Sequence, residues 1–141
     1  MAPPEPSAPP ECVFCRIAEH RAPAHVLYED DATMAFLDIF PFTRGHALVI
    51  PKRHGARITD LPLEDQTRLV QTLDTICRRS ERLTDDYNVA LNAGARAGQI
   101  VFHVHFHVIP RYGEANPFHP NVRNRLADDD ARALVATLSA P

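Results

Sequence analysis

The feature that most constrains this chain is a run of alternating residues between Phe102 and Arg111. Histidines and apolar residues take turns there, in the order His103, Val104, His105, Phe106, His107, Val108. Strict alternation of this kind is typical of a β-strand, and Pro110 ends the run. We therefore expect a strand whose histidines share one face while its apolar residues enter a core. Three imidazoles on one face favour a metal site, or a nucleophilic or acid–base site, over simple packing.

The chain has the size and composition of one globular domain. It contains 141 residues, of which 45% are hydrophobic and 23% charged. A net charge of −3 without a basic block argues against nucleic acid as the partner, although it allows a small nucleotide. No apolar run approaches the ~20 residues of a membrane span. Residues 1–11 are proline-rich and lack signal-peptide features, so we expect a disordered tail and a cytoplasmic protein.

The pattern along the chain predicts an α+β fold with a mainly antiparallel sheet of about five strands. Strands are expected at 26–29, 33–39, 46–51 and 87–92 and through the histidine run. The connections that join the first three strands to one another are short, and so is the connection between the last two. Short connections favour antiparallel pairing over a series of βαβ units.

Three helices accompany these strands. A short one follows Cys12, and a last one spans about Asp128–Leu138. Asp60 as N-cap and Pro62 in the first turn predict where the long helix begins. Its apolar stripe contains Leu69, Val70, Leu73, Ile76 and Cys77.

Cys12 and Cys15 form a C-x-x-C pair at the start of the first helix. This spacing serves zinc binding or redox chemistry, but the chain has no thioredoxin-like context. A zinc site needs two further ligands. Two reduced thiols that bind nothing are an equal alternative at this point. An odd total of three cysteines argues against a disulfide framework.

The histidine run suits chemistry at phosphorus. Clustering and partial burial both lower the pKa of an imidazole, so the middle histidine should be uncharged at neutral pH. A neutral imidazole can bind a metal or act as a nucleophile. Gly94 and Gly98 bracket the turn before the run, and Gln99 adds a neutral donor. Because glycines let backbone N–H groups approach an anion closely, turn and histidines together predict a phosphate pocket.

Residues 97–110 resemble the signature of the histidine triad (HIT) superfamily, His-φ-His-φ-His-φ-φ, where φ is apolar. The segments 12–17, 36–38 and 45–52 are similar to the same family. The resemblance is greatest to its bacterial, nucleoside-phosphoramidase-like branch. It implies a HIT domain at 12–112, with the tail 1–11 before it and a C-terminal extension with a short helix at 113–141.

The resemblance implies a hydrolase or transferase that attacks the α-phosphate of a purine nucleoside phosphoramidate or adenylate. By position, His105 is the nucleophile that forms a nucleotidyl-histidine, His107 contacts the phosphate and helps protonate the leaving group, and His46 steadies the site. Gln99 and the Val101 backbone N–H would hold phosphate oxygens. The other matching positions are Asp38 for the ribose hydroxyls, Phe14, Phe36 and Ile39 for the base, and Asn92 as a polar site residue.

The resemblance also completes a metal site. Cys12, Cys15, His54 and His103 match the Cys₂His₂ set of the cysteine-bearing family members. Four protein ligands make a closed, structural zinc site, so no catalytic cofactor is implied. The family pattern further implies a homodimer built across the long helix and a strand edge, with neither nucleic acid nor membrane as partner.

Three other hypotheses stay open at this point. A dinucleoside polyphosphate hydrolase of the same superfamily differs only in its leaving group. Ile100 bears on that difference, because eukaryotic phosphoramidase relatives carry a hydroxyl side chain there. A metal-dependent hydrolase or oxygenase would bind a catalytic ion with the histidine row, and a regulatory module would bind nucleotide with only incidental turnover.

Overall fold

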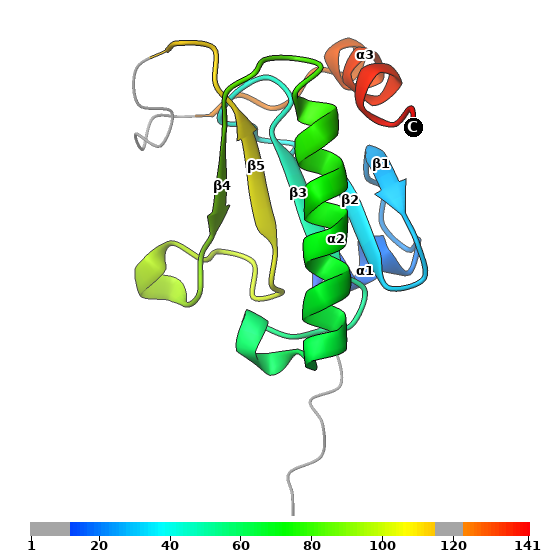
Figure 1. Cartoon of the computed structure of the whole chain (residues 1–141), viewed down its shortest axis with the longest axis vertical. Helices are drawn as coiled ribbons and strands as arrows, with labels where there is room; N and C mark the ends of the chain where they lie inside the picture. Colours follow the sequence, from blue (N-terminus) through cyan, green and yellow to red (C-terminus); the bar gives the residue numbers. More distant parts are fainter. Residues whose placement is uncertain (1–11, 115–122) are drawn as a thin grey trace, which may run out of the picture.

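The computed structural model describes residues 12–114 and 123–141, so the predicted tail at 1–11 lies outside the described residues. Its centre is a five-stranded sheet in the order β1-β2-β3-β5-β4, with every neighbouring pair antiparallel (Figure 1). The strands are β1 (Val26–Glu29), β2 (Thr33–Leu37), β3 (Ala47–Pro51), β4 (Tyr87–Leu91) and β5 (Phe106–Pro110). The helices are α1 (Val13–Ala18), α2 (Leu63–Ser80) and α3 (Asp128–Leu138), with 3₁₀ turns η1 (Ile58–Asp60) and η2 (Ala95–Ala97). The predicted α+β fold is thus confirmed.

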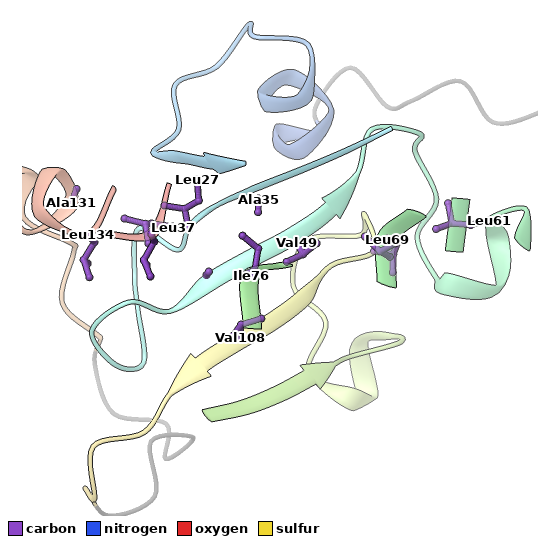
Figure 2. Packing of buried hydrophobic residues seen from close by; sticks show 13 residues of the cluster. Leu27, Ala35, Leu37, Val49, Leu61, Leu69, Ile76, Val108, Ala131 and Leu134 are labelled. Carbon is purple, nitrogen blue, oxygen red and sulfur yellow. The ribbon is translucent and has the colours of Figure 1, made fainter. Parts of the chain in front are cut away.

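The sheet is covered on both faces at its centre. As a result, every residue of β2 and β3 is buried. Beneath α2 and α3 lies one cluster, which includes Leu27, Ala35, Leu37, Val49, Leu69, Ile76, Val108 and Leu134 (Figure 2). Beneath α1, on the opposite face, lies a second cluster of Phe14, Ile17, Ala18, Met34, Phe36, Leu48 and Ile50. Neighbouring strand residues alternate between the two clusters, as the pleat of a strand requires. The face under α1 is the one that carries the candidate site.

The start of α2 differs from the prediction. Asp60 ends the turn η1, and its carboxylate accepts a hydrogen bond from the Arg57 backbone N–H at 2.9 Å. The N-cap is Pro62 instead, without a side-chain cap. Asp60 as N-cap is therefore wrong, since its carboxylate already closes the preceding turn. Of the predicted stripe, Ile76 is buried, whereas Val70 is 51% exposed and so does not share the buried face of the helix.

The strand β5 is shorter than the predicted histidine strand. Its ladder with β3 runs only from Val108 to Phe106, which lies opposite Val49. Before Phe106 the backbone turns to the loop after β3, where the Val104 N–H donates to the Gly55 carbonyl at 2.7 Å. The predicted alternation nevertheless continues, because Val104 and Val108 both enter the cluster beneath α2.

The C-terminal helix α3 is part of the main core. Ala131, Leu134 and Leu138 are almost completely buried there. Arg79 of α2 ties the end of α3 down, donating to the carbonyls of Leu138 and Ser139 at 3.2 Å. None of the described helices is long and apolar enough to cross a membrane.

Candidate active site and metal centre

A cavity of about 570 Å³ lies between α1, the loop after β2 and the segment that leads into β5. That volume is in the range of small-molecule sites, and most of the lining is apolar. The predicted residues that line it are Phe14, Phe36, Asp38, Ile39, Asn92, Val101, His105 and His107. Two predicted residues, His46 and Gln99, lie behind its wall.

His105 presents one defined nitrogen to this cavity. Its Nδ1 is 2.7 Å from the carbonyl oxygen of His103. A carbonyl only accepts hydrogen bonds, so Nδ1 carries the proton and Nε2 keeps its lone pair. The Phe14 ring packs edge-on against the imidazole, with centroids 5.1 Å apart. Burial lowers the pKa of His105 below 6.5, which keeps Nε2 unprotonated at neutral pH.

His46 and His107 form a pair whose protons are also fixed by the backbone. The Phe42 N–H donates to His46 Nδ1 at 3.0 Å, so His46 carries its proton on Nε2. That nitrogen is 2.9 Å from His107 Nδ1 and donates to it. His107 therefore has Nε2–H as its free donor. Burial, aided by the charges of His105 and Arg123, lowers the pKa of His107 to about 4.

Asp38 stands just after β2 at the wall of the cavity. Its Oδ1 accepts a hydrogen bond from the Phe40 backbone N–H at 2.8 Å, and its Oδ2 lies 3.7 Å from His46 Nε2. Burial raises the pKa of this carboxyl group. A largely buried carboxylate with accepting lone pairs can bind hydroxyl groups of a ligand.

The Gln99 side chain is used entirely within the protein. Its Oε1 accepts from the Gly94 N–H at 2.8 Å, and its Nε2 donates to the carbonyls of Ala56 and Val101 at 2.7 and 3.1 Å. The structure thus does not bring the Gln99 amide into the cavity, where we expected it to contact phosphate. The Val101 N–H, by contrast, has no acceptor among the described residues, and Val101 lines the cavity.

The four predicted metal ligands converge behind α1. The thiols of Cys12 and Cys15 and the Nδ1 atoms of His54 and His103 all lie within 4.8 Å of one another. Cys15 Sγ is 3.2 Å from His54 Nδ1, and both sulfurs are 3.5 Å from His103 Nδ1. Tetrahedral zinc with Zn–S of ~2.3 Å and Zn–N of ~2.0 Å separates its ligand atoms by about 3.3–3.8 Å.

The chemistry of this donor set fits a zinc ion. His103 Nε2 donates to the Pro51 carbonyl at 2.8 Å, which turns an unprotonated Nδ1 toward the thiols, as the outer partner of a ligating histidine does. Burial, followed by the neighbouring Cys12 thiol, raises the pKa of Cys15 to about 12. The thiolate form of Cys15 at neutral pH therefore requires a bound cation.

The three histidines of the run do not point at one ion. His103 faces the thiols, His105 faces the cavity, and His107 Nδ1 is occupied by His46. The third donor that joins His46 and His107 in a second cluster is Asp38, with ligand atoms within 4.8 Å. This geometry does not favour a catalytic metal bound by the histidine row.

Two further residues at the cavity were not found from the sequence. The Phe42 ring stacks on His46, with centroids 5.5 Å apart and planes at 17°. The guanidinium of Arg123 lies over the Phe42 ring, 4.1 Å from its centroid, and Arg123 lines the cavity. Phe42 and Arg123 both lie in irregular segments. No periodic pattern there distinguishes a site residue from any other phenylalanine or arginine.

Comparisons with family models, with known sequences and with solved structures all indicate the same family. The HIT domain matches residues 19–114. An uncharacterized HIT-like protein of Mycobacterium tuberculosis is 50% identical over 101 residues, which cover 70% of each chain. An adenosine 5'-monophosphoramidase of Candida albicans is 41% identical over 110 residues, covering 74% of this chain and 72% of that one.

A solved structure resembles this fold. It is a Zn-bound histidine triad family protein from Mycobacterium smegmatis, with a TM-score of 0.76 and 40% identity over 92% of this chain and 94% of that one. Sequence and fold thus agree, and the chain belongs to the HIT domain family.

Proposed function

We propose that this chain is a nucleotide hydrolase or transferase that attacks the α-phosphate of a purine nucleoside phosphoramidate or adenylate through a nucleotidyl intermediate on His105. The observation that carries the proposal is the hydrogen bond from His105 Nδ1 to the His103 carbonyl. It leaves Nε2 as an unprotonated nucleophile at the cavity wall. The relationship to an adenosine 5'-monophosphoramidase supports a nucleotide substrate.

The substrate would lie along the cavity. The purine packs between the apolar side chains of Phe14, Phe36 and Ile39, and the ribose hydroxyls donate to the Asp38 carboxylate. Asn92 offers a further polar contact. This arrangement brings the α-phosphate to His105, where the Val101 N–H and His107 Nε2–H donate to its oxygens.

In the first step, His105 Nε2 forms a bond to phosphorus while the bond from phosphorus to the leaving group breaks. The leaving atom takes the bonding electron pair. The imidazole becomes positively charged because Nδ1 keeps its proton, and the His103 carbonyl stabilises that charge. A leaving amine departs neutral when the substrate nitrogen enters the step already protonated, as an ammonium-like nitrogen, whereas a sulfate or phosphate departs as an anion.

His107 acts in this step as a hydrogen-bond donor to the phosphate and the leaving atom. Protonation of His107 at Nδ1 would bring this new N–H against the N–H on His46 Nε2. The hydrogen bond from His46 therefore opposes an imidazolium at His107. In the second step, water attacks phosphorus and the N–P bond breaks. The electron pair returns to His105 Nε2, the nucleoside monophosphate is released, and one proton passes to solvent. A transferase reaction would replace the water by another nucleophile.

Zinc bound to Cys12, Cys15, His54 and His103 would have a structural part in this reaction. It would hold α1 and the His103 segment together. Phe14 lies between two of the ligands in sequence and packs on His105, and His103 supplies the carbonyl that orients His105.

The test of the function is a trapped intermediate and a turnover panel. Adenosine phosphoramidate, an aminoacyl-adenylate and diadenosine polyphosphates are offered to wild type, to His105→Ala and to His20→Ala, a matched control at an exposed histidine. We expect His105→Ala to lower kcat at least ~10³-fold and His20→Ala to leave it unchanged. Rapid quenching and peptide mass spectrometry should find a nucleotide on His105. No turnover of any substrate by wild type would contradict the function, and turnover without the adduct would contradict the intermediate.

We also infer that the chain forms a homodimer. β4 is an edge strand of the sheet, and Val89 on it is 44% exposed. Val70 is the matching apolar residue on the outer side of α2. Light scattering at micromolar concentration should give twice the 15.8 kDa of one chain, and a mass of one chain would contradict the dimer.

A further inference from the structure

Arg123 is a cavity residue to which the proposed reaction gives no part. Its guanidinium lies 4.1 Å from the centroid of the Phe42 ring, and that ring stacks on His46. His46 in turn donates to His107. The stack of Arg123, Phe42 and His46 therefore holds the guanidinium at the part of the cavity wall that includes His107.

Arg123 is the one lysine or arginine among the described residues that line this cavity. The hydrogen bonds of His46 and His107 keep these two imidazoles neutral. Asp38 is the one carboxylate in the same lining, and the ion-pair contact it makes is with His46 at 3.7 Å. A guanidinium in a mostly apolar cavity, with no carboxylate oxygen at ion-pair distance among the described residues, is suited to bind an anion of the ligand.

The charge of Arg123 acts on the histidine pair and on Asp38. It contributes to the lowered pKa values of His46 and His107 and counteracts the raised pKa of Asp38, whereas the side-chain charge that acts on His105 is that of Asp38. A group displaced by His105 leaves phosphorus on the side opposite to His105. Because His46 keeps His107 from becoming an imidazolium, a leaving group that needs no proton suits this wall better than one that must be protonated.

We propose that Arg123 determines substrate specificity by binding an anionic group, a phosphate or sulfate, on the leaving-group side of the α-phosphate. The proposal rests on the proposed function for the position of the α-phosphate at His105. In such a substrate, the bond from the α-phosphorus to the bridging oxygen breaks as the bond to His105 Nε2 forms. The oxygen keeps the electron pair, and the guanidinium balances the charge of the departing anion.

The experiment compares the binding of AMP with that of ADP, which carries one more phosphate on the leaving-group side. Calorimetry is done on His105→Ala protein, so that no turnover intervenes, with and without Arg123→Gln. Arg125→Gln is the matched control, because Arg125 is an exposed arginine of the same segment. We expect ADP to bind at least ~10-fold more tightly than AMP, and Arg123→Gln to remove this preference while changing AMP affinity less than ~3-fold. Arg125→Gln should keep the preference.

Two results would overturn the proposal. An ADP-to-AMP preference unchanged by Arg123→Gln would show that the guanidinium does not contact the second anion. An equal loss of affinity for both nucleotides would assign Arg123 to the α-phosphate or to packing on Phe42. The comparison is independent of catalysis, so a wild type without turnover refutes the proposed function while the binding data still decide the role of Arg123. If neither nucleotide binds, both proposals are refuted.

Discussion

At the scale of single residues, backbone carbonyls decide which nitrogen of His103 and of His105 is unprotonated. The Pro51 carbonyl accepts a hydrogen bond from His103 Nε2–H, and the His103 carbonyl accepts one from His105 Nδ1–H. The result is opposite in the two rings: His103 turns Nδ1 to the thiols, while His105 keeps Nε2 for the cavity. Three histidines that look equivalent in the sequence are thereby given different chemistry.

The neutral histidines make stability depend on pH. The pKa of His107 is about 4 in the folded protein and ~6.5 when unfolded, so between these values the unfolded chain binds more protons. Stability is therefore complete above pH ~6.5 and falls as the pH decreases toward 4, by at most about 1.4 kcal/mol per pH unit for one histidine. Urea denaturation from pH 7.5 to 4.5 should show a shallower loss for His107→Gln than for wild type. Parallel curves for wild type and His107→Gln would contradict the prediction.

Most residues at the cavity could be predicted from the sequence because a family motif carries them, but their contacts could not. Gln99 is adjacent to the triad segment as expected, yet its amide is turned inward by the backbone of its own loop, at Gly94 and Val101, and by the distant Ala56 carbonyl. Arg123 was missed because its position depends on where the chain returns after the sheet is complete. A local pattern gives the face of a strand on which a residue lies and not the partner that it meets.

At the scale of elements, the same limit explains where β5 begins. Alternation correctly predicted which side chains enter the core, since Val104 and Val108 do so. It could not predict that the backbone leaves the ladder before Phe106, because that depends on the Gly55 loop of another segment. Helix α3, in contrast, has the predicted bounds because its acidic first turn is a local signal.

The loop between β4 and β5 offers a test at this scale. Gln99→Glu replaces the Nε2 donor by an oxygen that faces the carbonyls of Ala56 and Val101. A buried oxygen against two acceptors should lower the free energy of unfolding by about 3 kcal/mol at neutral pH and, by shifting Val101, lower kcat at least ~10-fold. Gln71→Glu makes the same change at an exposed position of α2 and should cost less than ~0.5 kcal/mol. Urea denaturation measures the stability of both variants. Equal losses of stability in Gln99→Glu and Gln71→Glu would show that the hydrogen bonds of the Gln99 amide do not stabilise the loop.

At the scale of the whole molecule, α1 is short and is held to the sheet from two sides. Its apolar face packs on β2 and β3 through Phe14 and Ile17. At its start, Cys12 and Cys15 meet His54 from the loop after β3 and His103 from the segment before β5. A helix of six residues has little stability of its own, so its place depends on these tertiary contacts.

Zinc should therefore stabilise the entire domain and not only the helix. A ligand that binds only the folded chain adds about 2.7 kcal/mol at a free concentration 100 times its Kd, which corresponds to a rise in Tm of roughly 5–10 °C. We expect mass spectrometry of untagged protein to give about one zinc per chain, and chelation to lower Tm by this amount. The variant Cys15→Ser should lose the metal and melt at the same temperature with and without chelator, whereas Cys77→Ser, away from the cluster, should respond like wild type. Well under one zinc per chain, or a Tm that chelation leaves unchanged, would refute the metal centre, because the fourfold convergence behind α1 would then be held by thiol–imidazole hydrogen bonds alone.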